Sequence, residues 1–388
     1  KIQIADWISL NPYAPPMKGD LSANLKFSMS PGMLNGAGVV TLADFTYAKK
    51  RVGTLDLALD ITTSRSGAIT ANTGLKIDGK EVMMANGALN DTTLSDPFRL
   101  DFALTRLPLD IANPFIGGAA TLDGYLSGNM DVTGSMSAPM FDGYLDFDSA
   151  TAKVAMLGTT FRFSEEKIPV DSNVIRFDRY AIYGVNDNPL EITGRVDMRS
   201  LADISLDLGL HADNMQVVGN SKRRGSDVYG KAFISLDATA KGDMRMINAR
   251  ANLAVKEGTN VTYVMPEAGS QLSSQSAGDM VHFVNFADTT AIAEVDSVAP
   301  SGMLFNLAAM LSVEEGSVIG VDLSANGQDR VQVQSNGILD FTMNPLGDTR
   351  TTGRLNITGG FVRYSPPLMS EKLFDFQEGS YVAFNGDM

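Results

Sequence analysis

Two residue types that commonly build chemical sites are nearly missing from this chain. Its 388 residues include no cysteine and only two histidines, His211 and His282. The lack of cysteine excludes disulfide frameworks, thiolate metal sites and cysteine nucleophiles. Two histidines are too few for a histidine-rich metal cluster, so we expect neither a metal nor a cofactor. A cysteine-free chain suits either redox environment, and the compartment stays open at this point.

Long apolar runs and an excess of positive charge are also lacking. No segment approaches the roughly 18 to 20 consecutive apolar residues that a membrane-spanning helix needs, and the first residues lack the apolar core of a signal peptide. Because the chain begins at Lys1, we interpret it as a piece of a longer protein. A net charge of -14 repels nucleic-acid phosphates at long range, so we expect no nucleic-acid partner.

Apolar and polar residues alternate with a period of two along most of the chain. Within residues 19–28 the apolar positions are Leu21, Ala23, Leu25 and Phe27. Such alternation is typical of β-strands with one apolar and one polar face. Residues 301–316 are ambiguous, because Met303, Leu307 and Met310 also fit a helical stripe. We therefore predict an all-β chain folded as an elongated, curled antiparallel meander.

A two-strand pattern returns about every 105 residues. The first strand of each copy opens at a glycine, and these are Gly19, Gly124, Gly230 and Gly337. The second strand opens at Gly38, Gly143, Ala251 and Gly353. We interpret the recurring glycines as turn residues between strands. Chance spacing in a β-rich chain is the alternative to a true repeat, but it does not explain the shared two-strand pattern.

Repeats of this kind contact only their neighbours along the chain, so we predict one body over residues 1–388 instead of separate compact domains. The predicted repeats are 1–118, 119–229, 230–336 and a partial fourth repeat, 337–388. Residues 266–279, rich in serine, glutamine, alanine and glycine, have no periodicity. They are predicted to form a mobile loop within the third repeat.

The sequence offers no catalytic motif, and we expect no enzyme activity. His211 and His282 are interpreted as solvated strand residues, since a catalytic histidine needs a nucleophile and an orienting acid nearby. Residues 186–188 (Asn-Asp-Asn) fit a turn better than a calcium site. The carboxylates at 165–166 are adjacent and so point to opposite faces of a strand. The basic cluster at 221–225 fits a solvated loop, with an anionic head-group contact as the alternative.

The apolar face that all these strands share must be covered or used. A second sheet would convert it into an ordinary core, whereas a sheet that curls without closing would leave an open apolar groove. Such a groove would shield lipid acyl chains from water. The candidate groove-lining residues are Leu126, Met130, Val132, Leu145, Phe147, Ile192, Val196, Ile234, Leu236, Leu253, Val255, Leu339, Phe341, Leu355 and Ile357.

Motifs spread over residues 128–196 resemble a known family. The first is a glycine, serine and proline turn between strands, at Gly128, Gly134, Ser135, Pro139, Gly143 and Leu145. The second comprises Ile175, Phe177, Asn188, Pro189, Leu190, Ile192 and Gly194. Together with later segments they are similar to the C-terminal region of the translocation and assembly module family, TamB. The resemblance covers residues 120–388 well and the first 120 residues only in style.

The resemblance implies a half-open β-groove (a "β-taco") in the periplasm of a Gram-negative-type envelope. It implies an inner-membrane anchor outside this sequence and a BamA-family, TamA-like outer-membrane barrel as partner. The family is similar to AsmA-like and bridge-like lipid transfer proteins. Two functions follow as expectations. One is a conduit for phospholipid acyl chains, and the other is an assembly scaffold for outer-membrane protein clients that uses β-strand addition. A closed structural β-sandwich remains the third possibility.

Overall fold

The computed structural model describes residues 2–3, 16–31, 33–47, 50–90, 98–116, 118–135, 138–200, 203–222, 227–265, 304–324, 327–365 and 370–386. Within these ranges the single helical element is the 3-10 helix η1 (Leu109–Ala112), and nearly all the rest is strand. The all-β prediction is confirmed. The loop predicted at 266–279 lies outside the described residues.

The strands follow one another along the chain. They are β1 (Ile2–Gln3), β2 (Met17–Ser30), β3 (Met33–Tyr47), β4 (Lys50–Thr63), β5 (Ile69–Ile77), β6 (Lys80–Leu89), β7 (Phe98–Pro108), β8 (Ala120–Ser135), β9 (Ala138–Val154), β10 (Thr159–Phe163), β11 (Ile168–Asp171), β12 (Val174–Tyr183), β13 (Pro189–Asp197), β14 (Ser205–Asn220), β15 (Val228–Asp243), β16 (Met246–Val255), β17 (Asn260–Val264), β18 (Leu304–Asp322), β19 (Arg330–Met343), β20 (Thr349–Tyr364), β21 (Lys372–Asp375) and β22 (Tyr381–Asn385). The ambiguous segment around Leu307 and Met310 is therefore part of strand β18.

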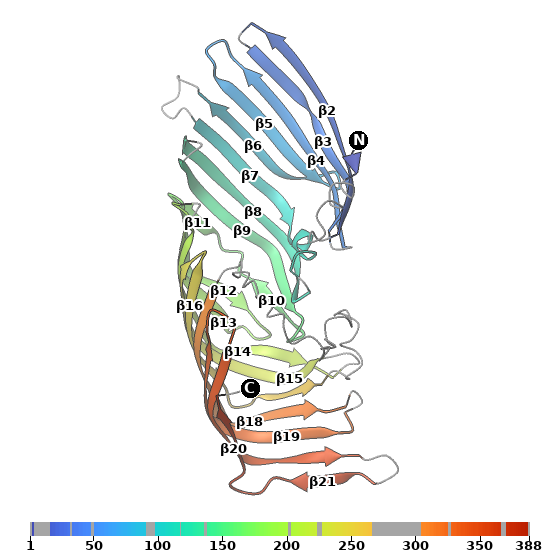
Figure 1. Ribbon diagram of the computed structural model, residues 1–388, viewed down its shortest axis with the longest axis vertical. Coiled ribbons are helices and arrows are strands. Elements are labelled where there is room, and N and C mark those ends of the chain that lie inside the picture. The colour runs from blue at the N-terminus through green and yellow to red at the C-terminus, as the bar shows by residue number, and fades with distance from the viewer. Residues whose placement is uncertain are drawn as a thin grey trace, which may run out of the picture. The chain divides into compact units, whose positions relative to one another are not determined.

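The chain divides into two units, Lys1–His211 and Ala212–Met388, and the division falls inside β14. In the first unit β2 to β9 pair antiparallel in chain order, and Figure 1 shows them side by side. Beyond β8, strand β9 pairs with both β10 and β11, and these pair in turn with β12. Strand β13 follows β12 antiparallel.

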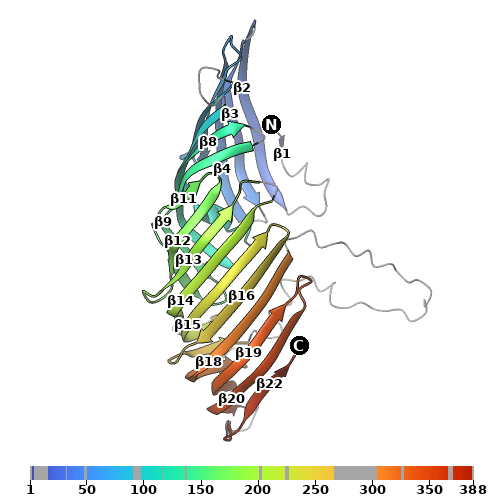
Figure 2. The same cartoon turned by 90° about the vertical axis from the view of Figure 1, so that its left-hand side faces the viewer.

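The second unit contains one departure from the antiparallel order. Strands β16 and β17 both pair with β15 antiparallel, yet β18 runs parallel to both of them. The antiparallel order then resumes through β19 and β20, whose free side carries β21 and β22. Figure 2 shows β15, β16, β18, β19, β20 and β22 next to one another.

The interpretation of the recurring glycines as turn residues is wrong, because all seven lie inside strands. Gly124 shows why glycine is needed within a strand. It sits at a register shift between β8 and β9 with φ +93°, and an added Cβ would lie 2.5 Å from the Ser149 carbonyl oxygen. Gly337 in β19 is similar, since its Cβ would lie 2.2 Å from the Arg354 carbonyl oxygen. These glycines allow close backbone approach where strands bend.

Candidate functional site

One face of the first unit's sheet is apolar from strand to strand. Residues directly opposite each other on paired strands point to the same face of a sheet. The pairing registers join one residue from each of nine strands, β2 to β9 and then β11, into a continuous row. Its members are Ala23, Val40, Leu57, Leu75, Met83, Leu104, Gly128, Leu145 and Ile168. No polar side chain interrupts this row.

A second row on the same face, four residues away along each strand, is equally apolar. It joins Phe27, Gly36, Ile61, Ala71, Gly87, Leu100, Val132 and Phe141. Three rows lie between these two. The middle one is on the same face and contains one polar side chain, at Thr73: Leu25, Gly38, Leu59, Thr73, Ala85, Phe102, Met130 and Gly143. The other two face the other way. One is polar except at one alanine: Lys26, Ala37, Asp60, Asn72, Asn86, Asp101, Asp131 and Asp142. The other is mixed: Asn24, Val39, Ala58, Gly74, Met84, Ala103, Asn129 and Tyr144. The sheet therefore separates a largely apolar face from an opposite face of mixed polarity that carries an acidic row.

The second unit carries an apolar face of its own. One row joins Leu236, Leu253, Leu311, Leu339, Gly353 and Phe384, and the next joins Ile234, Val255, Val313, Gly337, Leu355 and Val382. The parallel pairing of β16 with β18 preserves these rows because it keeps leucine opposite leucine. The opposite face carries Asp237, Asn252, Met310, Asp340, Thr352 and Asn385.

The structure places the predicted groove-lining residues on these faces. In the first unit Leu126, Met130 and Val132 of β8 lie opposite Phe147, Gly143 and Phe141 of β9. Val196 is opposite Ile175, Ile175 is opposite Val170, and Val170 is opposite Gly143, so Val196 lies on the same face. Leu145 lies opposite Gly128, and Ile192 lies opposite Tyr180. The eight predicted residues of the second unit lie on the apolar face of β15, β16, β19 and β20. Val132, Leu339 and Ile357 are buried, and the other twelve predicted residues are only partly buried.

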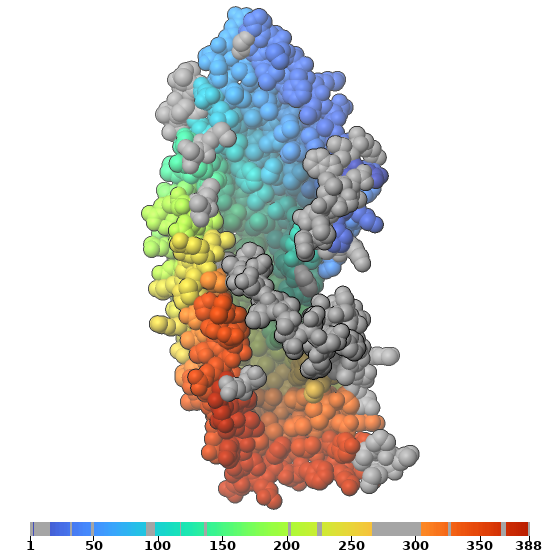
Figure 3. Space-filling model, in the orientation of Figure 1, coloured from blue at the N-terminus to red at the C-terminus, as the bar shows by residue number. Residues whose placement is uncertain are grey.

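The apolar face of the first unit is left open toward β2. Phe27 is 67% exposed and Met29 is 84% exposed, although both lie on the apolar face. A closed two-sheet core would bury such side chains completely. In Figure 3 the blue-to-green surface of this unit is hollowed between its margins. The apolar face is therefore an exposed surface as well as a packing surface.

One stretch of the face is filled by aromatic packing. The ring of Phe147 stacks on that of Phe163 with 5.1 Å between centroids, and Tyr180 lies 6.2 Å from Phe147. Tyr180 is buried, and its hydroxyl donates to the Ser164 carbonyl oxygen at 2.6 Å. Burial raises the pKa of Tyr180 above its ordinary value, so this hydroxyl stays protonated and keeps its hydrogen bond. Phe147 thus stabilises the fold in addition to its predicted place on the apolar face.

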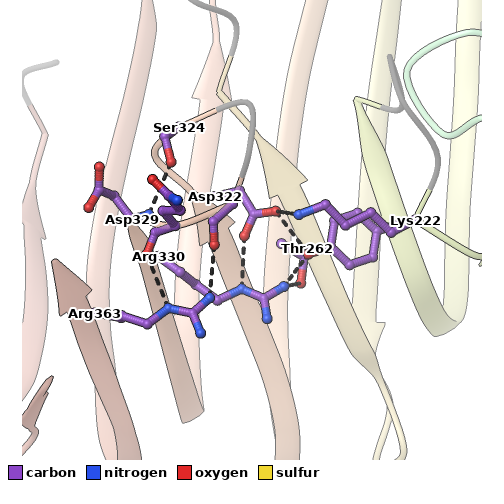
Figure 4. Close-up of polar contacts among 10 residues, drawn as sticks. Lys222, Thr262, Asp322, Ser324, Asp329, Arg330 and Arg363 are labelled. Atoms are coloured by element: carbon purple, nitrogen blue, oxygen red, sulfur yellow. Dashed lines mark hydrogen bonds and ion pairs between the residues drawn. The ribbon is translucent and has the colours of Figure 1, made fainter. Parts of the chain in front are cut away.

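A buried ionic network, which sequence reasoning missed, joins five segments of the second unit (Figure 4). The side chain of Asp322, at the end of β18, is fully buried and accepts hydrogen bonds from Lys222 Nζ at 2.8 Å, Tyr229 at 2.9 Å and Arg330 Nε at 2.8 Å. Arg330 also donates to Thr262 at 3.1 Å. Lys222 belongs to the basic cluster interpreted as a solvated loop. It does lie in a loop with its side chain 43% exposed, but its ammonium also pairs with the buried carboxylate of Asp322, which was not predicted. Residues 223–225 of the cluster lie outside the described residues.

The other candidates from the sequence occupy unremarkable surroundings. His211 and the carboxylates at 165–166 are exposed. Asp187 is fully exposed and lies 3.8 Å from Arg162. His282 lies outside the described residues. Within the described ranges no three metal-binding side chains converge, and no helix has the length and apolarity to cross a membrane.

A sheet with an apolar face of its own in each unit, left partly uncovered in the first, is the architecture of the class of β-groove proteins. A family model, the TamB C-terminal domain, matches residues 178–388. The chain belongs to the TamB family, whose role lies in biogenesis of the cell envelope and outer membrane and whose members work with TamA-type partners. The resemblance over residues 120–177 falls outside the matched range. Comparison with curated proteins and comparison with solved structures gave no match.

Proposed function

We propose that this protein is a non-enzymatic conduit that carries phospholipids between the inner and outer membranes across the periplasm. The observation that supports it is the unbroken apolar rows, such as the nine-strand row from Ala23 to Ile168. Acyl chains would lie along these rows while head groups stay in water. The full-length protein would be anchored in the inner membrane by a segment outside this sequence and would meet a BamA-family barrel at the outer membrane.

The energetics of lipid transfer favour a continuous face. Moving an acyl chain of about sixteen carbons from an apolar environment into water costs a free energy on the order of 12 kcal/mol, at ~0.8 kcal/mol per CH₂. A face that keeps the chain in apolar contact removes most of that cost at every step. Side chains of different size along the rows, such as Gly128 beside Leu145, leave room for flexible chains. The acidic row on the opposite face has no comparable affinity for them.

Introducing charge on the apolar face tests the conduit directly. We expect the wild-type chain, purified from bacteria without detergent, to carry phospholipid that native mass spectrometry and lipid extraction detect. The double variant Met130→Asp with Leu236→Asp should lose at least about nine-tenths of this lipid, because a carboxylate cannot enter an apolar contact without a large desolvation cost.

The matched control places the same two charges on the opposite face, as Asn129→Asp with Thr239→Asp, at exposed positions one and three residues away. This control should retain wild-type lipid. If the wild-type chain is folded and lipid-free, or if both double variants lose lipid equally, the conduit is wrong.

A second function, assembly of outer-membrane protein clients by strand addition, is supported by one sheet edge. Within the described residues β22 pairs with β20 alone, so its other edge has no partner strand. Tyr381 and Val382 on β22 are 55% and 45% exposed. Exposed strand edges with apolar side chains accept further strands readily.

A photo-crosslinker separates this second function from the first. Placed at Ala383 on β22, it should capture newly exported outer-membrane proteins in cells, because a client strand would add beside it. The same probe at Asp340, exposed on the interior strand β19, should capture none. Client capture that is equal at both positions, or absent at Ala383, would count against strand addition at this edge.

A further inference from the structure

A pocket of about 570 Å³ lies at one margin of the first unit's sheet. Its walls are the ends of β4 to β8 on one side and η1 on the other, and Figure 1 shows η1 as the cyan coil at the end of β7. The segment that carries η1 is tied down at two points. Asn113 exchanges hydrogen bonds of 2.9 and 2.7 Å with Leu122, and Phe115 stacks on Tyr47 at 4.2 Å. The pocket is therefore a built feature of the fold.

The floor of the pocket is apolar and continuous with the apolar face. Ile77 is 7% exposed, Val82 is 1% exposed, and Ile111 of η1 faces the same space. Ile77 is opposite Leu55 in the pairing of β4 with β5, and Leu55 is opposite Leu42 on β3. An acyl chain that leaves the pocket along this floor thus meets the apolar rows directly.

Charges of both signs surround this floor, and two of the cations are already paired. Arg51 holds Asp78 through two hydrogen bonds of 2.8 and 2.7 Å. Arg106 lies 2.9 Å from Asp148 and over the ring of Tyr125 at 4.0 Å. Each guanidinium has five N–H donors, so both keep donors for a further ligand.

Three further charged groups line the pocket and form no salt bridge within 4.0 Å in the described part of the chain, although Lys80 lies near enough to the Asp78 carboxylate to help lower its pKa. They are Lys80 and Glu81 at the start of β6 and Asp110 of η1. One ammonium and two carboxylates around an apolar floor complement a ligand that has an anionic group, a cationic group and an apolar tail. An anionic ligand without an amine would meet the two carboxylates unfavourably.

We propose that this pocket binds the head group of a zwitterionic glycerophospholipid that carries a primary amine, phosphatidylethanolamine in chemical terms. This inference rests on the proposed conduit and assigns it a head-group preference. The phosphate lies toward Lys80 and the free guanidinium donors of Arg51 and Arg106. The ammonium lies toward Glu81 and Asp110, and the acyl chains follow Ile77 onto the apolar face.

The test is competition between two lipids on the whole 388-residue chain. Equal amounts of phosphatidylethanolamine and phosphatidylglycerol with the same short acyl chains are offered, and native mass spectrometry counts each bound species. The wild-type chain should prefer phosphatidylethanolamine at least about threefold, the scale expected of exposed ion pairs. The variant Glu81→Lys with Asp110→Lys should reverse the preference, because it turns both carboxylates into cations. If that variant does not fold, Glu81→Gln with Asp110→Asn should abolish the preference, because it removes both carboxylates that recognise the ammonium and changes the side-chain volumes little.

The matched control makes the same charge change in the acidic row on the opposite face of the sheet, as Asp60→Lys with Asp131→Lys. It should leave the preference unchanged. Equal binding of both lipids by the wild-type chain would overturn the proposed head-group preference of the pocket but not the proposed conduit. Binding of neither lipid would overturn both. Free phosphoethanolamine should bind more weakly than the lipid. If it binds equally well, the pocket belongs to a soluble ligand and the lipid assignment is wrong.

Discussion

Replacing Asp322 with alanine should destabilise the second unit by about 3 to 5 kcal/mol, the usual cost of removing one partner from a buried ionic network. The Asp322 side chain is fully buried and binds Lys222, Tyr229 and Arg330. Removing its carboxylate leaves the guanidinium of Arg330, which is only 20% exposed, without its counter-charge. The network joins strands β15, β17, β18 and β19, so its loss should loosen all four together.

Hydrogen exchange measures this loss locally. Amides of β17 and β18 should exchange at least about a hundredfold faster in Asp322→Ala, since each 1.36 kcal/mol is a factor of ten. The control is Glu315→Ala, which removes an exposed carboxylate from the same strand and should change exchange little. Equal effects of the two substitutions would show that the buried network contributes nothing special to stability.

The loss of stability caused by Asp322→Ala should depend on pH, because it depends on the ionisation of Asp322. Burial opposes ionisation, but the hydrogen bonds from Lys222 and Tyr229 and the charge of Arg330 outweigh it, so the pKa of Asp322 is lowered. A carboxylate with a lowered pKa stabilises the folded state at every pH above its unfolded value, near 3.9, and loses this contribution as the pH falls further. The cost of Asp322→Ala should therefore be the same at pH 7 and pH 5 and shrink below about pH 4.

The alternation of apolar and polar residues was enough to predict the strands and their faces. Leu236 and Asp237 are neighbours in sequence, and the pairing register puts them in an apolar row and a polar row respectively. This works because successive side chains on a strand point to opposite faces, whatever the neighbouring strand is. Whether the face is covered depends on tertiary curvature, which alternation does not encode.

The parallel pairing of β16 and β17 with β18 was not predicted, although a signal exists in the sequence. Residues 255–259 read Val-Lys-Glu-Gly-Thr and residues 313–317 read Val-Glu-Glu-Gly-Ser. The register places Val255 beside Val313, and Lys256 forms an ion pair with Glu314. Similar segments that bend alike can lie side by side in parallel, and a search for short internal similarity would have pointed to this pairing.

The Asp322 network and the pocket under η1 were beyond sequence reasoning for a common reason. Lys222 and Asp322 are 100 residues apart, and Tyr47 and Phe115 meet although four strands, β4 to β7, lie between them in the sequence. Neither pair has a local pattern that links its members. Charged residues at strand ends are therefore interpreted as solvated loop residues until the pairing of the strands is known.

Gly124, one of the recurring glycines, should tolerate no side chain, whereas Gly74, which does not belong to the repeat, should tolerate one. Gly124→Val should destabilise the first unit by roughly 3 to 5 kcal/mol, because it adds backbone strain at φ +93° to a clash of the new Cβ with the Ser149 carbonyl oxygen at 2.5 Å. For a unit of this size that corresponds to a thermal midpoint about 10 °C lower.

Gly74 in β5 is the matched control, because its φ is ordinary for a strand and a Cβ there would meet only the Met83 carbonyl oxygen at 3.7 Å. Gly74→Val should leave the midpoint unchanged or raise it slightly, since valine suits a strand better than glycine does. Thermal unfolding followed by circular dichroism, with hydrogen exchange of the β8 and β9 amides, distinguishes the two variants. If both are tolerated, close backbone approach does not explain why glycine recurs about every 105 residues. If only Gly74→Val is tolerated, the repeat marks the places where the sheet must bend to expose its apolar face as a groove.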